Sequence, residues 1–260
     1  MERKPIKADI CEMPMHLRPF LENANVYDSS CSRGARVIFI DKDGGYYLKS
    51  AKKGTLKKEA DMTDYFYRKG LGTHIVDYFS DDKDWLLSER VVGEDCTFSD
   101  YLSDPLRLCD TIATLLRELH EVEGSACPVN HTQEYIKTVE TNYREGNYDV
   151  TLFPDNWGYS TPEEAFKIFE ENKRFFRTDT LLHGDYCLPN IMLNDWKFSG
   201  FIDLGNGGVG DRHVDLFWGA WTLNFNLRTD KYRERFFDVY GRDKIEEEML
   251  RVIAAAEVFG

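Results

Sequence analysis

The chain has 260 residues, 42% of them apolar, which is enough to bury the core of one large domain or of two lobes. Its net charge of −13 argues against nucleic acid as a partner, and no apolar run is long enough for a membrane helix. The six cysteines are scattered without a C-x-x-C pair, so we expect no zinc site, no secreted disulfide framework, and reduced thiols in a cytoplasm.

The first third of the chain has the pattern of a small β-sheet with one helix. Residues 37–49 are rich in Val, Ile, Phe and Tyr and are interrupted by Asp43-Gly44-Gly45, which predicts a hairpin. A helix is expected over residues 56–69, where two glycines follow it. Residues 75–79 and 85–88 are expected to be further strands.

From Pro105 onward the pattern is mostly helical. Leucine and isoleucine recur at helical spacing over residues 108–119. The run Thr161-Pro162-Glu163-Glu164 has the cap, proline and glutamate that are typical of a helix start. Between the helices, residues 181–215 form a compact run of short apolar strands and turns. Strands first and helices later predict an α+β fold rather than alternating βαβ units.

One carboxylate falls on the apolar side of the expected first helix. At 100° per residue, Glu59 lies near the centre of an arc of about 160°. The arc contains Leu56, Ala60, Met62, Thr63, Phe66 and Tyr67. A carboxylate that leaves water needs a cationic partner, and Lys49, which ends the preceding strand, is the natural candidate. Protein kinases hold nucleotide phosphates with such a pair; the alternative is an edge position where Glu59 reaches solvent.

The strongest signal is the run His183-Gly184-Asp185, followed by Asn190 and by Asp203 in Ile202-Asp203-Leu204-Gly205. Phosphoryl transfer requires positioning and charge neutralisation more than covalent chemistry. Asp185 suits the base that orients the attacking hydroxyl and takes its proton. Asn190 and Asp203 offer the oxygen ligands that Mg²⁺ prefers; alternatively they are turn residues. His183 is better explained as a structural residue that braces the loop.

These motifs resemble the signature of the aminoglycoside phosphotransferases, and especially of the 3′-type enzymes. The runs at 116–120 and 126–128 are similar to the central helix of that family and to the segment after it, so the resemblance covers nearly the whole chain. It implies an α+β, protein-kinase-like fold of two lobes. We expect a small β-sheet N-lobe of residues 1–88 that binds nucleotide, a hinge at 89–93, and a mainly helical C-lobe of residues 94–260 with the catalytic loop and the acceptor site.

The resemblance also implies a set of nucleotide contacts, with ATP or GTP as the phosphate donor and Mg²⁺ as the metal. Lys49 and Glu59 match the phosphate-binding lysine and its partner, and Tyr47 matches an aromatic residue that stacks on adenine. The run Ser88-Glu89-Arg90 resembles the hinge whose backbone pairs with the adenine edge. Further matches are Ser32 in the nucleotide loop, and Asp211, Arg212 and Asp215 where the family braces its activation segment.

The acceptor is expected to be a cationic small molecule. Residues 1–93 contain 16 Lys and Arg against 15 Asp and Glu, whereas residues 94–260 contain 17 against 31. This acidic field can steer a cation, although a solvated acidic surface explains it equally well. The resemblance implies that Asp155 and Glu257 contact amines of the substrate. The chain departs from the 3′-type pattern at Asn206, at Phe225 and Asn226, and at Gly260, which follows a residue that is terminal in some relatives.

The sequence therefore predicts a kinase that moves the γ-phosphate of a nucleotide to a hydroxyl of an aminoglycoside antibiotic, and so confers resistance. One alternative is a kinase of the same fold with another acceptor, such as a different antibiotic or an amino alcohol. The other is a nucleotide-binding pseudokinase that regulates a partner. The presence of Lys49, Asp185, Asn190 and Asp203 argues against the pseudokinase.

Overall fold

The computed structural model describes residues 4–7, 13–31, 34–149 and 157–260. The chain divides into two compact units. The first consists of Met1–Val92 with Ser199–Gly205, and the second of Gly93–Phe198 with Asn206–Gly260. The segment Ser199–Gly205 thus belongs to the first unit, although it lies more than a hundred residues beyond the expected hinge at 89–93.

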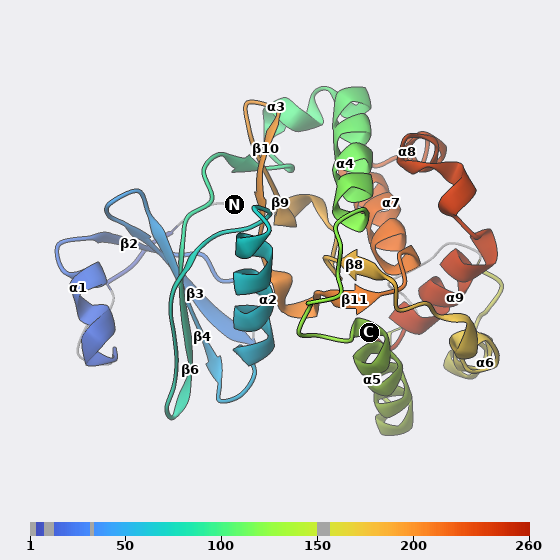
Figure 1. Cartoon of the computed structure of the whole chain (residues 1–260), viewed down its shortest axis with the longest axis horizontal. Coiled ribbons are helices and arrows are strands. Elements are labelled where there is room, and N and C mark those ends of the chain that lie inside the picture. Colours follow the sequence, from blue (N-terminus) through green and yellow to red (C-terminus); the bar gives the residue numbers. More distant parts are fainter. Residues whose placement is uncertain (1–3, 8–12, 32–33, 150–156) are drawn as a thin grey trace. The chain divides into compact units, whose positions relative to one another are not determined.

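The first unit is built on a six-stranded antiparallel sheet in the order β1-β2-β3-β4-β6-β5 (Figure 1). The strands are β1 (Lys4–Pro5), β2 (Asn25–Asp28), β3 (Ala35–Asp41), β4 (Tyr46–Lys52), β5 (Ile75–Ser80) and β6 (Lys83–Glu89). Strands β3 and β4 form the hairpin that the sequence predicts, in a register that pairs Val37 with Lys49. All three residues of its turn, Asp43 to Gly45, have positive φ.

Two helices accompany this sheet, α1 (Arg18–Leu21) and α2 (Lys57–Arg68). Helix α2 matches the predicted helix and packs against β5. Its buried face includes Ala60, Met62 and Phe66, as expected, and Glu59 lies among them. The prediction was wrong for Tyr67, which is 45% exposed, whereas Tyr65 is only 3% exposed.

A segment from a distant part of the chain also packs on α2. Phe201 places its ring against that of Phe66, with the centroids 6.2 Å apart, and its N–H donates to the carbonyl of Leu71. Helix α2 is therefore covered by the sheet and by a segment from the distant part of the chain. A helical wheel of residues 56–69 alone cannot show that a distant segment packs on part of this helix.

The second unit is mainly helical. Its helices are α3 (Ser99–Leu102), α4 (Pro105–His120), α5 (His131–Glu145), α6 (Pro162–Asn172), α7 (His213–Leu227), α8 (Arg233–Tyr240) and α9 (Glu247–Glu257). Helix α4 packs on α7 and α8, and α9 packs on α6 and α7 (Figure 1). The short strands are β7 (Glu94–Asp95), β8 (Thr180–Leu182), β9 (Ile191–Asn194) and β11 (Gly208–Gly210); β10 (Lys197–Phe201) leads back into the first unit.

Local capping explains where the two predicted helices begin. The side chain of Asp104 accepts from the N–H of Arg107, and Pro105 opens α4. The hydroxyl of Thr161 accepts from the N–H of Glu164 in the same way, which is the usual arrangement at a helix start. None of the helices in the described part of the chain has the length and apolar character that crossing a bilayer requires.

Candidate functional site

The loop that follows β8 is held by a buried carboxylate from α7. The N–H groups of His183 and Gly184 each donate to Asp215 at 2.8 Å. Gly184 has φ of 82°, and a Cβ placed on it would lie 2.0 Å from the carbonyl oxygen of Asn206. Only glycine fits this close approach. The backbone of the loop is therefore fixed on both sides.

Asp185 and Asn190 are brought together by the turn between them. The Nδ2 of Asn190 donates to the carbonyl oxygen and to Oδ2 of Asp185, both at 3.0 Å. Burial raises the pKa of the Cys187 thiol, and the neighbouring charge of Asp185 adds to the rise, so the thiol stays protonated. With its NH₂ engaged, Asn190 keeps its amide oxygen as the group that is left to accept a further bond or a metal. The carboxylate of Asp185 has a defined orientation before any ligand arrives.

A residue outside the predicted site supports Asp215. His120, the last residue of α4, has its Nε2 at 3.2 Å from Asp215 and its Nδ1 at 2.8 Å from the hydroxyl of Tyr240. Burial lowers the pKa of His120. Burial raises the pKa of Asp215, but the hydrogen bond from His120 and other contacts outweigh it, so the pKa is lowered overall. We therefore assign a neutral imidazole that donates from Nε2 to the carboxylate and accepts at Nδ1.

The sequence contained a signal for His120 that we did not use. In α4 it follows the buried Ile112 and Leu116 at intervals of eight and four residues, so it lies on the apolar face of the helix. A polar residue on such a face requires a buried partner. The position of His120 does not, however, indicate which of the later helices supplies that partner.

The first unit contains the predicted Lys49–Glu59 ion pair. The Nζ of Lys49 lies 2.9 and 2.7 Å from the two oxygens of Glu59, and 3.0 Å from Oδ1 of Asp203. The side chains of Lys49 and Glu59 are 20% and 12% exposed, whereas that of Asp203 is 55% exposed. The alternative, in which Glu59 reaches solvent at a helix edge, is therefore excluded.

These contacts set the charges of the cluster. Burial lowers the pKa of Lys49, but Glu59 and Asp203 outweigh it, so the pKa is raised overall. Burial raises the pKa of Glu59, and Asp203 adds to this, while Lys49 opposes it. Asp203 has φ of 58°, a backbone conformation that is uncommon outside glycine. A lysine that is shared between two carboxylates is the cation available to a phosphate ligand.

Two of the other predicted nucleotide residues, Tyr47 and Ser88, lie on the same sheet, and Arg90 follows its strand β6. Tyr47 of β4 faces Phe39, with the ring centroids 5.1 Å apart, and pairs in register with Ser88 of β6. The N–H of Arg90 donates to the carbonyl of Gly45 at 2.9 Å. An adenine edge that uses this N–H would therefore have to displace Gly45. Ser32 lies outside the described residues.

On the acceptor side, Glu257 is buried in the second unit. Its Oε1 accepts from the hydroxyl of Tyr135 at 2.8 Å, and Trp218 also hydrogen-bonds it. Burial raises the pKa of Glu257 to about 7, against these two hydrogen bonds, and the charge of Asp185 adds to the rise. Asp155, the other predicted acceptor residue, lies outside the described residues.

The two residues that replace expected acids do not supply a negative charge. Phe225 is 49% exposed and stacks on Trp221. The Nδ2 of Asn226 donates to the carbonyl and hydroxyl of Thr222 within α7. The hydroxyl of Thr222 also accepts from the N–H of Leu188 beside the catalytic loop. This part of α7 therefore offers aromatic rings where the 3′-type pattern has carboxylates.

The raised pKa of Glu257 predicts a pH-dependent stability. Below pH 4.5 the group is neutral in both states. Between 4.5 and about 7 the unfolded chain ionises while the folded protein keeps the proton. The unfolding free energy should therefore fall over this range, by about 3 kcal/mol, and level off above it. Glu257→Gln, which keeps the shape of the side chain, should remove that decrease.

Urea unfolding at pH 5 and pH 8 measures this effect for the wild type and the variant. The difference between the two proteins isolates Glu257 from the other titrating groups. A variant that loses stability between the two pH values as steeply as the wild type would contradict the assignment.

The comparisons with known proteins agree with one another. The sequence model of the "Phosphotransferase enzyme family" matches residues 32–252. A protein of Lactococcus lactis named probable aminoglycoside 3′-phosphotransferase is 51% identical over 99% of this chain and 98% of its own length. An aminoglycoside 3′-phosphotransferase of Staphylococcus aureus is 28% identical over 90% of this chain and 93% of its own.

Solved structures show the same fold. The crystal structure of an aminoglycoside 3′-phosphotransferase of type VIII matches with a TM-score of 0.75 at 22% identity, over 95% of this chain and 100% of that one. A Streptomyces rimosus aminoglycoside phosphotransferase, solved with ADP and streptomycin, matches with a TM-score of 0.69 at 23% identity, over 86% and 91%. The predicted α+β, protein-kinase-like fold is thereby confirmed, and the chain belongs to the phosphotransferase enzyme family.

Proposed function

We propose that this protein transfers the γ-phosphate of ATP or GTP to a hydroxyl of an aminoglycoside, and that this reaction confers resistance to the antibiotic. The observation that carries the proposal is the 51% identity, over nearly the whole of both chains, to a protein named for that activity. The pairing of Asp185 with Asn190 and the Lys49–Glu59 ion pair support it, because each is an arrangement that phosphoryl transfer requires.

Each unit would supply part of the chemistry. Asp185, oriented by Asn190, would accept the proton of the attacking hydroxyl as its oxygen bonds to phosphorus. Lys49, held by Glu59, would bind oxygens of the nucleotide phosphates. Tyr47, Ser88, Arg90 and Ser32 are the proposed contacts of the nucleoside. The proposed compartment is the cytoplasm, where thiols stay reduced; cell fractionation tests it.

The residues present fit Mg²⁺ as the metal. The carboxylate of Asp203 is more than half exposed, and the amide oxygen of Asn190 is not used by its contacts with Asp185. Mg²⁺ typically binds one or two such protein oxygens together with phosphate oxygens of the substrate. When bound, the metal would neutralise charge on those phosphates.

Asp203→Ala should therefore weaken nucleotide binding only when Mg²⁺ is present. A loss of roughly tenfold or more is expected for a charge-assisted metal contact. Titration calorimetry with a non-hydrolysable nucleotide, with Mg²⁺ and with EDTA, measures the two affinities. Equal weakening in both conditions would show that the change acts on folding and not on a metal.

We expect a cationic acceptor, because a positive charge beside Glu257 would favour the ionised form of this buried carboxyl. A ligand ammonium close to this buried carboxylate stabilises its charged form and lowers its pKa from about 7. Binding at neutral pH should then release protons into the buffer. Calorimetry in buffers of different ionisation enthalpy detects that release, and Glu257→Gln should abolish it. Cation binding without proton release would remove Glu257 from the acceptor site.

Turnover with a panel of acceptors tests the function itself. Kanamycin, neomycin, an amino alcohol and a neutral sugar should be assayed for nucleotide-dependent phosphorylation at low and high salt. We expect the aminoglycosides to react, with a Michaelis constant that rises with salt as the long-range attraction is screened. Phosphorylation of the amino alcohol alone would indicate the same-fold kinase with another acceptor, and no turnover with any compound would indicate a regulatory pseudokinase.

A further inference from the structure

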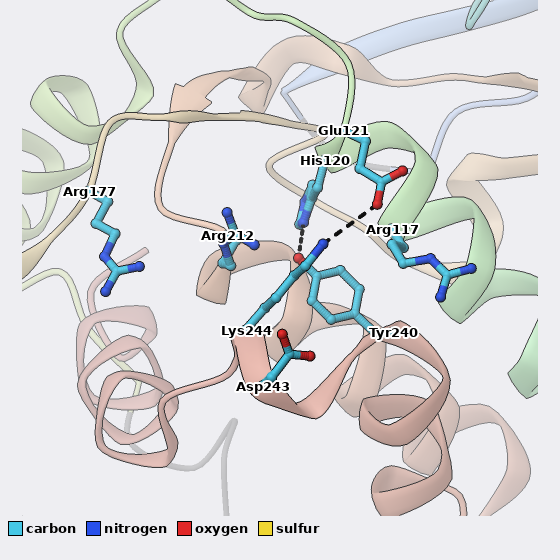
Figure 2. Close-up of a pocket in the computed structure, with 8 residues that line it drawn as sticks. All are labelled: Arg117, His120, Glu121, Arg177, Arg212, Tyr240, Asp243 and Lys244. Carbon is cyan, nitrogen blue, oxygen red and sulfur yellow. Dashed lines mark hydrogen bonds and ion pairs between the residues drawn. The ribbon is translucent and has the colours of Figure 1, made fainter.

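A second cavity lies within the second unit, outside the residues that the proposed reaction uses (Figure 2). Its volume is about 330 Å³. Residues at the end of α4, after α6, before α7 and around the end of α8 line it: Arg117, His120, Glu121, Arg177, Arg212, Tyr240, Asp243 and Lys244.

The lining is basic, although the surrounding part of the chain is strongly acidic. It contains three arginines and a lysine against two carboxylates. Lys244 is paired with Glu121 at 3.5 Å, and Arg177 with Glu246. Within the described residues, Arg117 and Arg212 form no ion pair with a carboxylate. Arg117 donates to the carbonyl of Val239. Outside the two ion pairs, the lining retains Arg117, Arg212 and the carboxylate of Asp243.

Arg212 has further unused hydrogen-bonding capacity. Its Nη2 donates to the hydroxyl of Thr180 at 3.3 Å. Burial raises the pKa of Tyr240 to about 12, and the positive charge of Arg212 opposes that rise. The Nε of Arg212 is buried and has no partner among the described residues. A buried guanidinium normally has its donors satisfied. Figure 2 shows Arg212 and Lys244 on either side of the hydrogen bond between His120 and Tyr240.

We propose that this cavity binds a phosphate-type dianion. Arg117 and Arg212 form no ion pair with a carboxylate of the described residues, and arginine donors fit the oxygens of a phosphoryl group in a planar, forked geometry. The partly exposed Lys244 provides a third cation at the rim. Binding here is independent of which acceptor the protein phosphorylates.

The floor of the cavity connects the bound dianion to the loop that carries Asp185. Tyr240 donates to His120, His120 donates to Asp215, and Asp215 accepts the N–H groups of His183 and Gly184. A dianion that binds Arg212 offsets the positive charge that Tyr240 experiences at the start of this series of hydrogen bonds. Binding should therefore change the amide signals of His183 and Gly184, which end this series of hydrogen bonds.

Calorimetry and amide NMR spectra of the full chain test the proposal. Inorganic phosphate and glycerol phosphate should be titrated separately, with acetate as a monoanion, while a non-hydrolysable nucleotide with Mg²⁺ saturates its own site. We expect phosphate or its ester to bind at least tenfold more tightly than acetate, and to shift the amide signals of His183 and Gly184. The tighter of the two phosphates identifies whether the natural ligand is the free ion or a phosphomonoester.

Single substitutions locate the site. Arg117→Met and Lys244→Met should each weaken phosphate binding by roughly tenfold, whereas Asp243→Asn should tighten it. Lys167→Met is the matched control and should not change the affinity for phosphate, because this equally charged side chain on α6 is 73% exposed and does not line the cavity. The proposal is overturned if acetate binds equally well, or if the control weakens binding as much as Lys244→Met.

Discussion

Replacing Asp185 by alanine is expected to reduce phosphoryl-transfer turnover by about 100-fold or more, the usual effect of losing a general base. This corresponds to about 3 kcal/mol of transition-state stabilisation. The affinity for nucleotide should change little, because the residues proposed to hold the phosphates are Lys49 and the metal ligands. Steady-state kinetics and nucleotide calorimetry measure the two effects separately.

Asp185→Asn provides the control for packing. Its amide oxygen can still accept from Nδ2 of Asn190, as the carboxylate does at 3.0 Å, but it cannot take a proton at neutral pH. Both variants should therefore lose turnover, and the asparagine variant should unfold at the wild-type temperature. Turnover within a few-fold of the wild type in Asp185→Asn would exclude this residue as the base.

Lys49→Met should lower the unfolding free energy by about 3 kcal/mol, because it leaves Glu59 buried without its partner. It should also raise the Michaelis constant for the nucleotide. The pKa of Glu59 is already raised by burial, and losing Lys49 raises it further. The stability that is lost should therefore return as the pH falls, because the folded protein takes up the proton first, and should be restored fully below about pH 4.5, where the carboxyl is neutral in both states.

The double variant Lys49→Met/Glu59→Gln separates the two roles of the pair. Removing both charges should restore most of the stability, because no buried carboxylate is left unpaired. The raised Michaelis constant should remain, because the cation that binds phosphate is still missing. Urea unfolding and nucleotide kinetics on the same preparations give both results. A double variant with normal nucleotide kinetics would remove Lys49 from the phosphate site.

Much of the chemistry could be predicted from local sequence patterns. The ion pair of Lys49 and Glu59 followed from the phase of one helix, because an acid on an apolar face needs a nearby cation. The placement of Asp185 and Asn190 in one candidate site followed from a motif only eight residues long, whereas the hydrogen bond between them was not predicted. In both cases the partners are close in the sequence, so few arrangements of the backbone are possible.

The features that could not be predicted depend on distant segments. The anion cavity combines residues from Arg117 to Lys244, and nothing in their spacing indicates that they share one wall. The role of His120 depends on Asp215, ninety-five residues later. The packing of Phe201 on Phe66 of α2 likewise joins residues that are more than a hundred positions apart. Each depends on tertiary packing, which local periodicity does not encode.

The return of Ser199–Gly205 to the first unit has a consequence for the order in which the protein folds during synthesis. The ribosome completes Val92 well before it reaches Phe201, whose ring packs on Phe66 of α2. At the usual 5–20 residues per second, the interval to Gly205 lasts about 6–20 s. During this interval the nascent sheet and α2 lack the segment Ser199–Gly205, which completes the unit. The amino-terminal unit can therefore complete its fold only late in translation, although most of its residues are synthesised first.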